Sequence, residues 1–485
     1  MRSLFGVVHL LGSVLVLFSA LYSLPILAAL YYHESAIVPF LAGALSSLGG
    51  GLLLRRSTLR FRTDLKPRDA YLLVTLTWLV LAAVATVPLL MLLPGLSFTH
   101  AYFESMSGLS TTGSTVLAGL DGLPHAVNMW RASLSWLGGM GIIVMAIAIL
   151  PLLGIGGMEM YRSETPGPVK DAKLTPRIAQ AAKLLWFVYA GLTATCAVAL
   201  RAAGMNWFDA ICHAFAVLSL GGFSTHDASV GYFHSPLIEA VLMVFMLVAA
   251  INFATHFVAL RKGEPATYRR DPEAKWTLVW IGLSCVGVSI HVWLHNVYPD
   301  FATAFRYVSF NLVSIATSCG LVNTNYGQWP VFAPMWMLFL SCVCASSGST
   351  GGGIKVFRVL VLGKQSLREM FALVHPQAVA PLKIAGQLVS NRVVFSVLAF
   401  IFLYFIANVV LTFALLISGL DFTSAVSAIV ASMNNAGPGL NVVGPGSTYG
   451  TLSDFQLWMC TVAMLLGRVE IFTVLVLFTP TFWRK

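Results

Sequence analysis

The sequence predicts an all-α polytopic membrane protein, in which two extra N-terminal transmembrane helices precede four pseudo-symmetric units of helix, short re-entrant helix and helix. Three observations indicate this fold class: the composition, the long apolar stretches, and a segment that recurs four times. Of the 485 residues, 58% are hydrophobic and 10% are charged, with a mean hydropathy of +0.82. A soluble domain carries about 25% charged residues. The composition therefore excludes a cytosolic enzyme, a nucleic-acid binder and a disordered scaffold.

The apolar stretches number about ten, and most approach the ~20 residues that cross a bilayer. They lie near 4–30, 37–54, 71–94, 132–154, 180–203, 236–260, 277–295, 331–345, 391–418 and 455–478. The first imitates a signal peptide but exceeds the apolar core of about 7–15 residues found in one. We therefore expect it to be the first transmembrane helix.

Basic residues cluster in every second connection between these stretches. The clusters fall within residues 55–68, 162–183, 261–275 and 355–392 and at 484–485. The positive-inside rule places these connections and both termini in the cytoplasm. The net charge of +10 is then explained by orientation and does not call for a nucleic-acid partner. Arg131, Arg201 and Arg306 lie near the ends of stretches, where we expect them to be snorkelling anchors.

A related segment occurs in four of the opposite connections, where an aromatic residue stands 15 positions before a glycine. The pairs are Phe98 and Gly113, Trp207 and Gly222, Phe305 and Gly320, and Phe422 and Gly437. About three helical turns lie between the two residues, which is too short to span a bilayer. Four occurrences along the chain indicate an internal repeat.

A short helix that enters the membrane and ends there leaves carbonyl groups unpaired at an end that carries partial negative charge. Such backbone is tolerated at membrane depth only where it is buried in protein or lines a watery cavity. Glycine then allows the following carbonyls to point inward together. A ring of carbonyls replaces the hydration shell of a monovalent cation, so the repeat predicts a central ion pore with four pore helices.

The repeat divides the chain into five parts. We expect the two extra helices in residues 1–66, pore repeat 1 in 67–165, pore repeat 2 in 166–270, pore repeat 3 with a gate loop in 271–385, and pore repeat 4 in 386–485.

Several motifs occur at the repeats: TTGST near Gly113, WLGGMGIIV at 136–144, LGGFSTHDAS around Gly222, GSTGGGIKVFR at 348–358 and NNAGPGL around Gly437. With them the whole chain resembles the Trk/Ktr/HKT superfamily of potassium transporters, most closely the bacterial Trk membrane subunits. The resemblance implies a selectivity filter of backbone carbonyls for K+. These belong to Thr111, Thr112 and Gly113; Leu220, Gly221 and Gly222; Thr317, Ser318, Cys319 and Gly320; and Asn434, Asn435, Ala436 and Gly437.

The resemblance also implies an activity and partners. It implies potassium uptake across the bacterial cytoplasmic (inner) membrane, with no catalytic residues and no organic cofactor on this chain. Members of the superfamily form homodimers in the lipid bilayer. They are gated by a cytosolic ring of regulatory subunits that bind NAD- or ATP-type nucleotides. In the family, serine in place of the first filter glycine accompanies sodium preference, so Gly113 indicates potassium.

Residues 346–353 are all glycine, serine or threonine, a composition that opposes helix formation. The stretch is a flexible cytoplasmic linker or, because apolar sequence brackets it tightly, a loop at membrane depth. The resemblance implies an intramembrane gate loop below the filter. Its residues are Gly348, Ser349, Thr350, Gly351, Gly352 and Gly353, with Lys355 just beyond as a positive barrier.

Arg468 lies in the middle of the last apolar stretch. Arginine at a helix centre costs about 2.5–3.5 kcal/mol on insertion scales, so it faces the bundle interior or water. We expect it to project into the pore below the filter, where it opposes the ion or steadies the gate loop. A structural cap on the carbonyls of another broken helix is the alternative.

Other functions fit less well. A proton- or sodium-coupled cation symporter would use the same central site, but such folds usually carry a twofold inverted repeat. Ser224, His226 and Asp227 are too close in sequence to form a hydrolytic relay within a regular element. The GSTGGGIK segment lacks the spacing of a phosphate-binding loop, so any nucleotide binds a partner.

Overall fold

The computed structural model describes residues 2–61, 67–148, 174–378 and 380–484. The boundary predicted between repeats 1 and 2 lies outside these residues, as does part of the basic cluster at 162–183. Apart from one small hairpin, the regular elements of the described residues are helices. Six of these helices are long and apolar enough to cross a membrane, or eight if each of two bent pairs counts as one span. The predicted fold class is confirmed.

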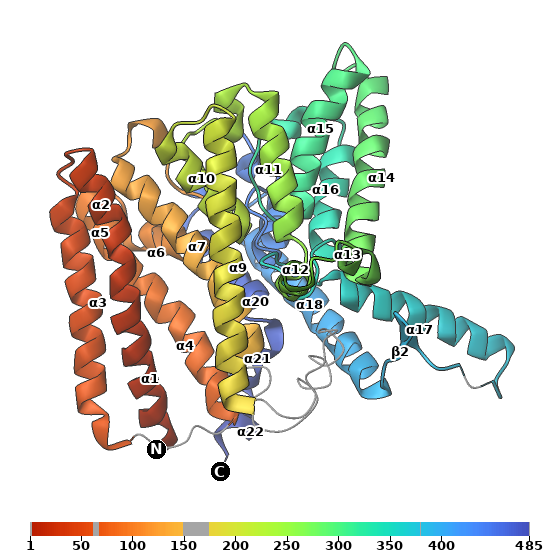
Figure 1. Ribbon diagram of the computed structural model, residues 1–485, viewed down its shortest axis with the longest axis horizontal. Helices are drawn as coiled ribbons and strands as arrows, with labels where there is room; N and C mark the ends of the chain where they lie inside the picture. Colours follow the sequence, from red (N-terminus) through yellow and green to blue (C-terminus); the bar gives the residue numbers. More distant parts are fainter. Residues whose placement is uncertain (1, 62–66, 149–173, 379, 485) are drawn as a thin grey trace.

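The N-terminal helices stand together at one edge of the molecule (Figure 1). They are α1 (Arg2–Ser19), η1 (Ala20–Tyr22), α2 (Ser23–Tyr31), α3 (Ile37–Ser57) and η2 (Leu59–Phe61). Glycines allow α1 and α3 to approach closely, since a Cβ on Gly12 would lie 2.8 Å from the carbonyl oxygen of Gly51. Ser47 also donates a hydrogen bond to the Leu15 carbonyl across this contact, at 2.8 Å. Small residues and interhelical hydrogen bonds are the usual means of packing helices in lipid.

The remaining elements form four successive groups. The first group contains α4 (Pro67–Ala85), α5 (Val87–Leu92), α6 (Phe98–Leu109), η3 (Leu120–Gly122) and α7 (His125–Ala148). The second contains α9 (Leu174–Ala202), α10 (Trp207–Ser219), η4 (Ser229–Phe233), α11 (Pro236–Ala249), α12 (Phe253–Lys262) and α13 (Ala266–Arg270).

The third group contains α14 (Pro272–Leu294), α15 (Phe301–Ala316), η5 (Tyr326–Gln328), α16 (Phe332–Val343), α17 (Val356–Val374) and the antiparallel hairpin of β1 (Lys383–Ile384) and β2 (Gln387–Leu388). The fourth contains α18 (Asn391–Ile417), α19 (Phe422–Met433), η6 (Asn441–Val443), η7 (Tyr449–Thr451), α20 (Asp454–Arg468), α21 (Ile471–Leu475), η8 (Val476–Phe478) and α22 (Pro480–Trp483).

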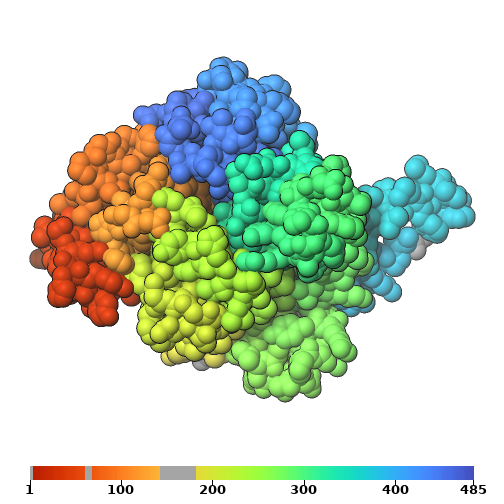
Figure 2. Space-filling model, turned by 90° about the horizontal axis from the view of Figure 1, so that it is seen from above, coloured from red at the N-terminus to blue at the C-terminus, as the bar shows by residue number. Residues whose placement is uncertain are grey.

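The four groups surround a common centre. Seen from above, they form sectors that follow one another from orange through yellow-green and green to blue, with the red N-terminal helices outside the orange sector (Figure 2). One apolar core joins the N-terminal helices to the first and fourth groups, and a second joins the second and third groups. Both chain termini lie at the same end of the molecule, and α17 projects sideways from the body (Figure 1).

The second long helix is interrupted in the last three groups. The α11–α12 pair bends by 96°, and α20 bends by 111° against residues 471–478. The predicted spans 236–260 and 455–478 are therefore broken helices. The predicted span 331–345 is also wrong as a span, because α16 has only 12 residues. These breaks lie close to the site described next.

Candidate functional site

Each of the four groups contains one short helix of the repeated segment, and each of these helices begins at a polar cap. The caps are the side chains of Ser97 on α6, Asn206 on α10, Asp300 on α15 and Asp421 on α19, each of which accepts a hydrogen bond from a backbone N–H of the first turn. Such caps satisfy donors that a helix start leaves free. The helix α15 begins at Phe301, one turn before the predicted Phe305, because Asp300 provides its cap.

The same four helices end in the same way. At each end a backbone N–H reaches the carbonyl five residues back at 2.8 Å, and the residue before it has a left-handed conformation. The bonds run from Thr112 to Ser107, Gly221 to Ala216, Cys319 to Ser314 and Ala436 to Ala431. The left-handed residues are Thr111, Leu220, Ser318 and Asn435, with φ between 51° and 65°. This is the Schellman motif, which usually has glycine at the left-handed position.

The four turns that follow these helices form a closed ring of contacts. A Cβ on Gly113 would lie 2.5 Å from the Gly221 oxygen, and one on Gly222 would overlap the Cys319 oxygen. The series continues in order, because a Cβ on Gly320 would lie 2.6 Å from the Ala436 oxygen and one on Gly437 would lie 2.9 Å from the Thr112 oxygen. Each central glycine thus packs against the carbonyl before the glycine of the next turn. We call these four turns, residues 110–114, 219–223, 317–321 and 434–438, the ring turns.

All fourteen residues predicted for the filter lie in the ring turns. Within the described chain, no hydrogen bond is donated to the carbonyl oxygens of 111–113, 220–222, 317–320 or 434–436. The Gly437 carbonyl differs, since it accepts from Ser114 Oγ at 2.9 Å and from Tyr449 OH at 3.1 Å. Buried carbonyl groups are nearly always paired. The ring turns therefore present a set of buried acceptors that suits a cation.

Residues 346–353 lie directly against the ends of the short helices. Thr350 is fully buried, and its hydroxyl donates to the Leu218 carbonyl at 3.0 Å. A Cβ on Gly351 would lie 3.1 Å from the Thr317 oxygen, and one on Gly352 would overlap the Asn434 oxygen. The stretch thus touches three of the four helix ends, which is not the environment of an exposed linker. We keep the name gate loop for residues 346–353, that is, the predicted 348–353 together with Ser346 and Ser347, and its gating role stays a prediction.

The start of the gate loop is tied to the break between α11 and α12. The Ser346 N–H donates to the Ala250 carbonyl at 3.0 Å, and the Phe253 N–H donates to the Gly348 carbonyl at 3.2 Å. The carboxylate of Glu273, at the start of α14, accepts from the Ser347 N–H at 2.6 Å. None of these anchoring residues is predicted from the sequence. Their only signal was one asparagine, Asn252, inside an apolar stretch.

Arg468 bridges the gate loop and α7. It is 1% exposed and donates to the Thr350 carbonyl and to the Gly138 carbonyl, both at 2.8 Å. Its two partners are thus a carbonyl of the loop and a carbonyl within the continuous helix α7, and its role in gating stays a prediction. Glu470, where the helix breaks with φ +62°, pairs instead with Arg358 at 3.0 Å. Lys355 turns back towards the loop, with its Nζ 3.5 Å from the Ser349 carbonyl.

The three arginines predicted as snorkelling anchors differ in role. Arg131 is 2% exposed and pairs with Glu104 at 2.7 Å, so the prediction for it is wrong. Arg306 forms a bidentate pair with Glu239, at 2.8 and 2.7 Å. Arg201 is exposed, and its guanidinium lies 5.9 Å from the Trp207 ring.

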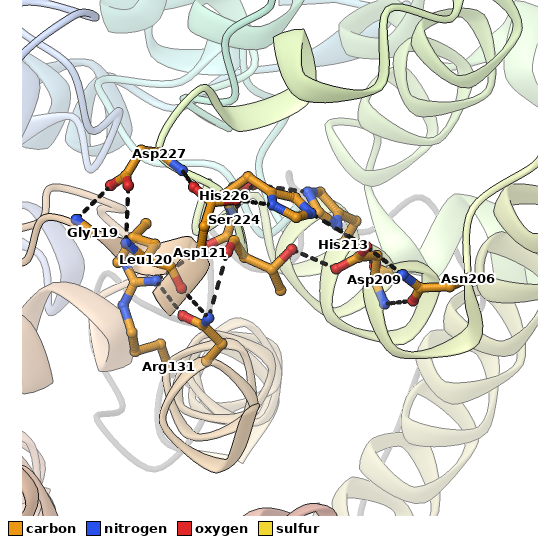
Figure 3. A network of polar contacts seen from close by, with 12 residues as sticks. Gly119, Leu120, Asp121, Arg131, Asn206, Asp209, His213, Ser224, His226 and Asp227 are labelled. Atoms are coloured by element: carbon orange, nitrogen blue, oxygen red, sulfur yellow. Dashed lines mark hydrogen bonds and ion pairs between the residues drawn. The ribbon is translucent and has the colours of Figure 1, made fainter. Parts of the chain in front are cut away.

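A polar network joins the first two groups beyond the ring turns (Figure 3). The ring of His226 lies between the carboxylates of Asp121 and Asp209, hydrogen-bonded to the first and 3.3 Å from the second. Its face stacks on Tyr232, with 3.6 Å between centroids. Ser224 Oγ instead contacts His213 Nε2 at 3.0 Å. The side chains of Ser224 and His226 in the FSTHD segment therefore contact different side chains.

We expect the stability of this network to depend on pH. Burial lowers the pKa of His226, but its hydrogen bonds to Asp209 and Asp121 outweigh burial and raise the pKa above its usual range. A raised pKa in the folded state means that the stabilisation is complete below the unfolded value of about 6.5 and is lost as pH rises through the folded value. The Tm of the purified protein should therefore fall as pH rises above neutrality. His226→Gln should remove most of that slope, and an unchanged slope would contradict the assignment.

The sequence and the fold are both similar to those of known cation transport proteins. A family model described as TrkH, cation transport protein, matches residues 38–485. The chain is similar to the Trk system potassium uptake protein TrkH of Vibrio parahaemolyticus, with 46% identity over 99% of each chain. The protein of that name in Escherichia coli K12 is 43% identical, also over 99% of each. A crystal structure of the potassium transporter TrkH from Vibrio parahaemolyticus matches with a TM-score of 0.91 at 43% identity, covering 99% of this chain and 100% of that one.

Proposed function

The chain belongs to the TrkH family of cation transport proteins, and we propose that it takes up potassium through a channel-like pore whose filter is formed by the ring turns. The closed ring of contacts among the four turns carries this proposal. It brings unpaired carbonyls from four parts of the chain to one place, as a selectivity filter requires. The names of the similar proteins, which describe potassium uptake, support K+ as the transported and bound ion.

Conduction then depends on the backbone. The carbonyls of the ring turns replace the water around a dehydrating K+. The C-terminal ends of α6, α10, α15 and α19 add about half a negative charge each towards the same place. Since the carbonyls carry only partial charges, the ion is held without a carboxylate and leaves readily.

The gate loop closes the pathway below the filter in this proposal, and Arg468 holds it there. A cytosolic regulatory ring that binds an NAD- or ATP-type nucleotide would release it. The exposed basic residues at the end of α12 and on α13 support a seat for such a subunit, because α12 begins where the loop is anchored. They are Arg261, Lys262, Arg269 and Arg270.

We also propose a homodimer in the bacterial cytoplasmic (inner) membrane, with both termini in the cytoplasm. The apolar surface of α17 supports a second copy, since Leu367 is 63% and Leu373 is 82% exposed on a helix that projects from the body (Figure 1). The repeats are proposed at the boundaries given above, 67–165, 166–270, 271–385 and 386–485, after the two extra helices of 1–66.

A proton- or sodium-coupled symporter would use the same ring turns, and electrical recording distinguishes the two mechanisms. We expect the purified chain in a planar bilayer with potassium salts, without a proton or sodium gradient, to give unitary currents once the gate is released. Flux that instead stays in fixed proportion to protons or sodium in vesicles would favour the symporter.

A further inference from the structure

The carboxylate of Glu104 holds the chain just after the first ring turn. Glu104 lies on α6 and is 1% exposed. It accepts hydrogen bonds from the Thr115 hydroxyl at 2.9 and 3.0 Å and from the Val116 N–H at 2.9 Å. These two residues follow Gly113 by two and three positions. The course of the chain as it leaves the first ring turn is thus fixed to the helix that precedes it.

Arg131 extends this connection to the second ring turn. The guanidinium donates to Glu104 at 2.7 Å and to the Thr115 hydroxyl at 3.2 Å. It also donates to the Ser224 carbonyl at 3.0 Å and lies 4.3 Å from the ring centroid of Phe223. Phe223 and Ser224 directly follow Gly222. The planar guanidinium, with five donors in a fixed geometry, suits a group that joins several acceptors at once.

In each of the other three repeats, a side chain at a similar position of the short helix also contacts the chain that follows the ring turn. We call such a contact a strap, and in these three repeats it is made by neutral or weakly basic groups. The contacts from short helix to outgoing chain are His213 Nε2 to Ser224 Oγ at 3.0 Å, Asn311 Nδ2 to Asn323 Oδ1 at 2.6 Å, and Ser427 Oγ to the Leu440 N–H at 2.8 Å. A contact between the short helix and the chain after the ring turn therefore occurs at a similar position in all four repeats. The second repeat adds a charged contact nearer the start of its helix, where Asp209 accepts from the Thr225 hydroxyl at 2.6 Å. At the position of Glu104 itself, these contacts show a carboxylate, joined to the next repeat through Arg131, in the first repeat.

We infer that Glu104 and Arg131 are positioning residues for ion selectivity, which hold the carbonyls of the first two ring turns at the spacing that favours K+ over Na+. This inference rests on the proposed function of the ring turns. Neither side chain is placed as a ligand of the ion. Both act through the outgoing chain, two or three residues beyond the filter glycine. A substitution that removes the several donors of the Arg131 guanidinium but keeps its charge should therefore change ion selectivity more than it changes the stability of the fold.

The test compares uptake of rubidium and of sodium by proteoliposomes. Arg131→Lys keeps the charge but cannot reach Glu104, Thr115 and Ser224 together, so we expect the rubidium/sodium ratio to fall by about tenfold, the scale of one network interaction. Thr115→Val removes the hydroxyl that both charged groups share and should lower the ratio in the same direction. Glu104→Gln still accepts from the Val116 N–H and should have a smaller effect.

The matched control is Arg306→Lys, which weakens another bidentate arginine–glutamate pair, in which Glu239 is buried and Arg306 is partly exposed. Its partner Glu239 lies on α11, and neither residue contacts a ring turn among the described hydrogen bonds. We expect a lower Tm and an unchanged ratio. The inference is overturned if Arg131→Lys and Thr115→Val fold with the wild-type ratio, or if Arg306→Lys changes the ratio as much. If Arg131→Lys does not fold, Thr115→Val decides alone. A wild-type protein that does not discriminate between the ions would instead refute the proposed filter.

Discussion

Deletion of residues 348–353 is expected to produce a pore that conducts without any regulatory partner. The deleted segment fills the space against the short-helix ends, where Thr350 donates to the Leu218 carbonyl at 3.0 Å and Gly352 packs on the Asn434 carbonyl. Basal rubidium uptake by proteoliposomes should rise by at least about tenfold, which corresponds to a shift of about 1.4 kcal/mol between closed and open states. A deletion variant that folds as the wild type does but carries no flux would refute the gate.

Single substitutions test the same gate with less disturbance. Arg468→Ala removes the bond that holds the Thr350 carbonyl, and Gly352→Ala places a methyl group where it overlaps the Asn434 oxygen. Both should raise basal flux by a smaller factor than the deletion. Gly191→Ala on α9 is the control, because a Cβ there meets nothing within 4 Å and α9 is not part of the proposed dimer contact. If all three variants behave alike, the contacts of the gate loop do not limit flux.

Gly113→Ser is expected to reduce the preference for rubidium over sodium by about tenfold or more, since a displaced carbonyl changes the coordination of the ion. A side chain at this position meets two obstacles. The residue has φ +80°, and a Cβ would lie 2.5 Å from the Gly221 oxygen. The substitution should therefore push the first and second ring turns apart. Uptake of both ions is measured on the same vesicle preparation.

The Gly119→Ser variant separates the effect of a positive φ from the effect of a close contact with a neighbouring carbonyl. Gly119 also has a positive φ, +73°, but a Cβ there meets nothing within 4 Å. This variant carries the backbone strain of about 1–2 kcal/mol without the close approach, so it should lower stability and leave selectivity unchanged. If Gly113→Ser and the wild type select identically, the filter assignment is wrong.

The ring turns could be located from sequence because the same constraint acts on one glycine of every repeat. A side chain on a glycine that packs on a carbonyl of the next turn would displace that turn. Glycine therefore recurs at one distance from an aromatic residue, at Gly113, Gly222, Gly320 and Gly437. The left-handed residues that precede these glycines show no comparable pattern in the sequence. Leucine at 220 adopts φ +53° because tertiary contacts impose it, and no propensity would indicate that.

The broken helices and the buried charges depend on partners that are distant in sequence. The bend after α11 is anchored by a gate loop almost a hundred residues later, as in the bond from Ser346 to Ala250. Arg131 was misjudged for the same reason. A position near the end of an apolar stretch is typical of a snorkelling arginine, and its partner Glu104 lies 27 residues earlier in another helix.

The ring of contacts closes between the first and the last ring turn, where Gly437 meets the Thr112 carbonyl. During translation the first ring turn is synthesised early and the fourth ring turn is synthesised late. A growing chain therefore holds three ring turns for some time but cannot complete the ring until the fourth group has entered the membrane. If the ring turns form the filter as proposed, a chain terminated before residue 434 therefore lacks a complete filter.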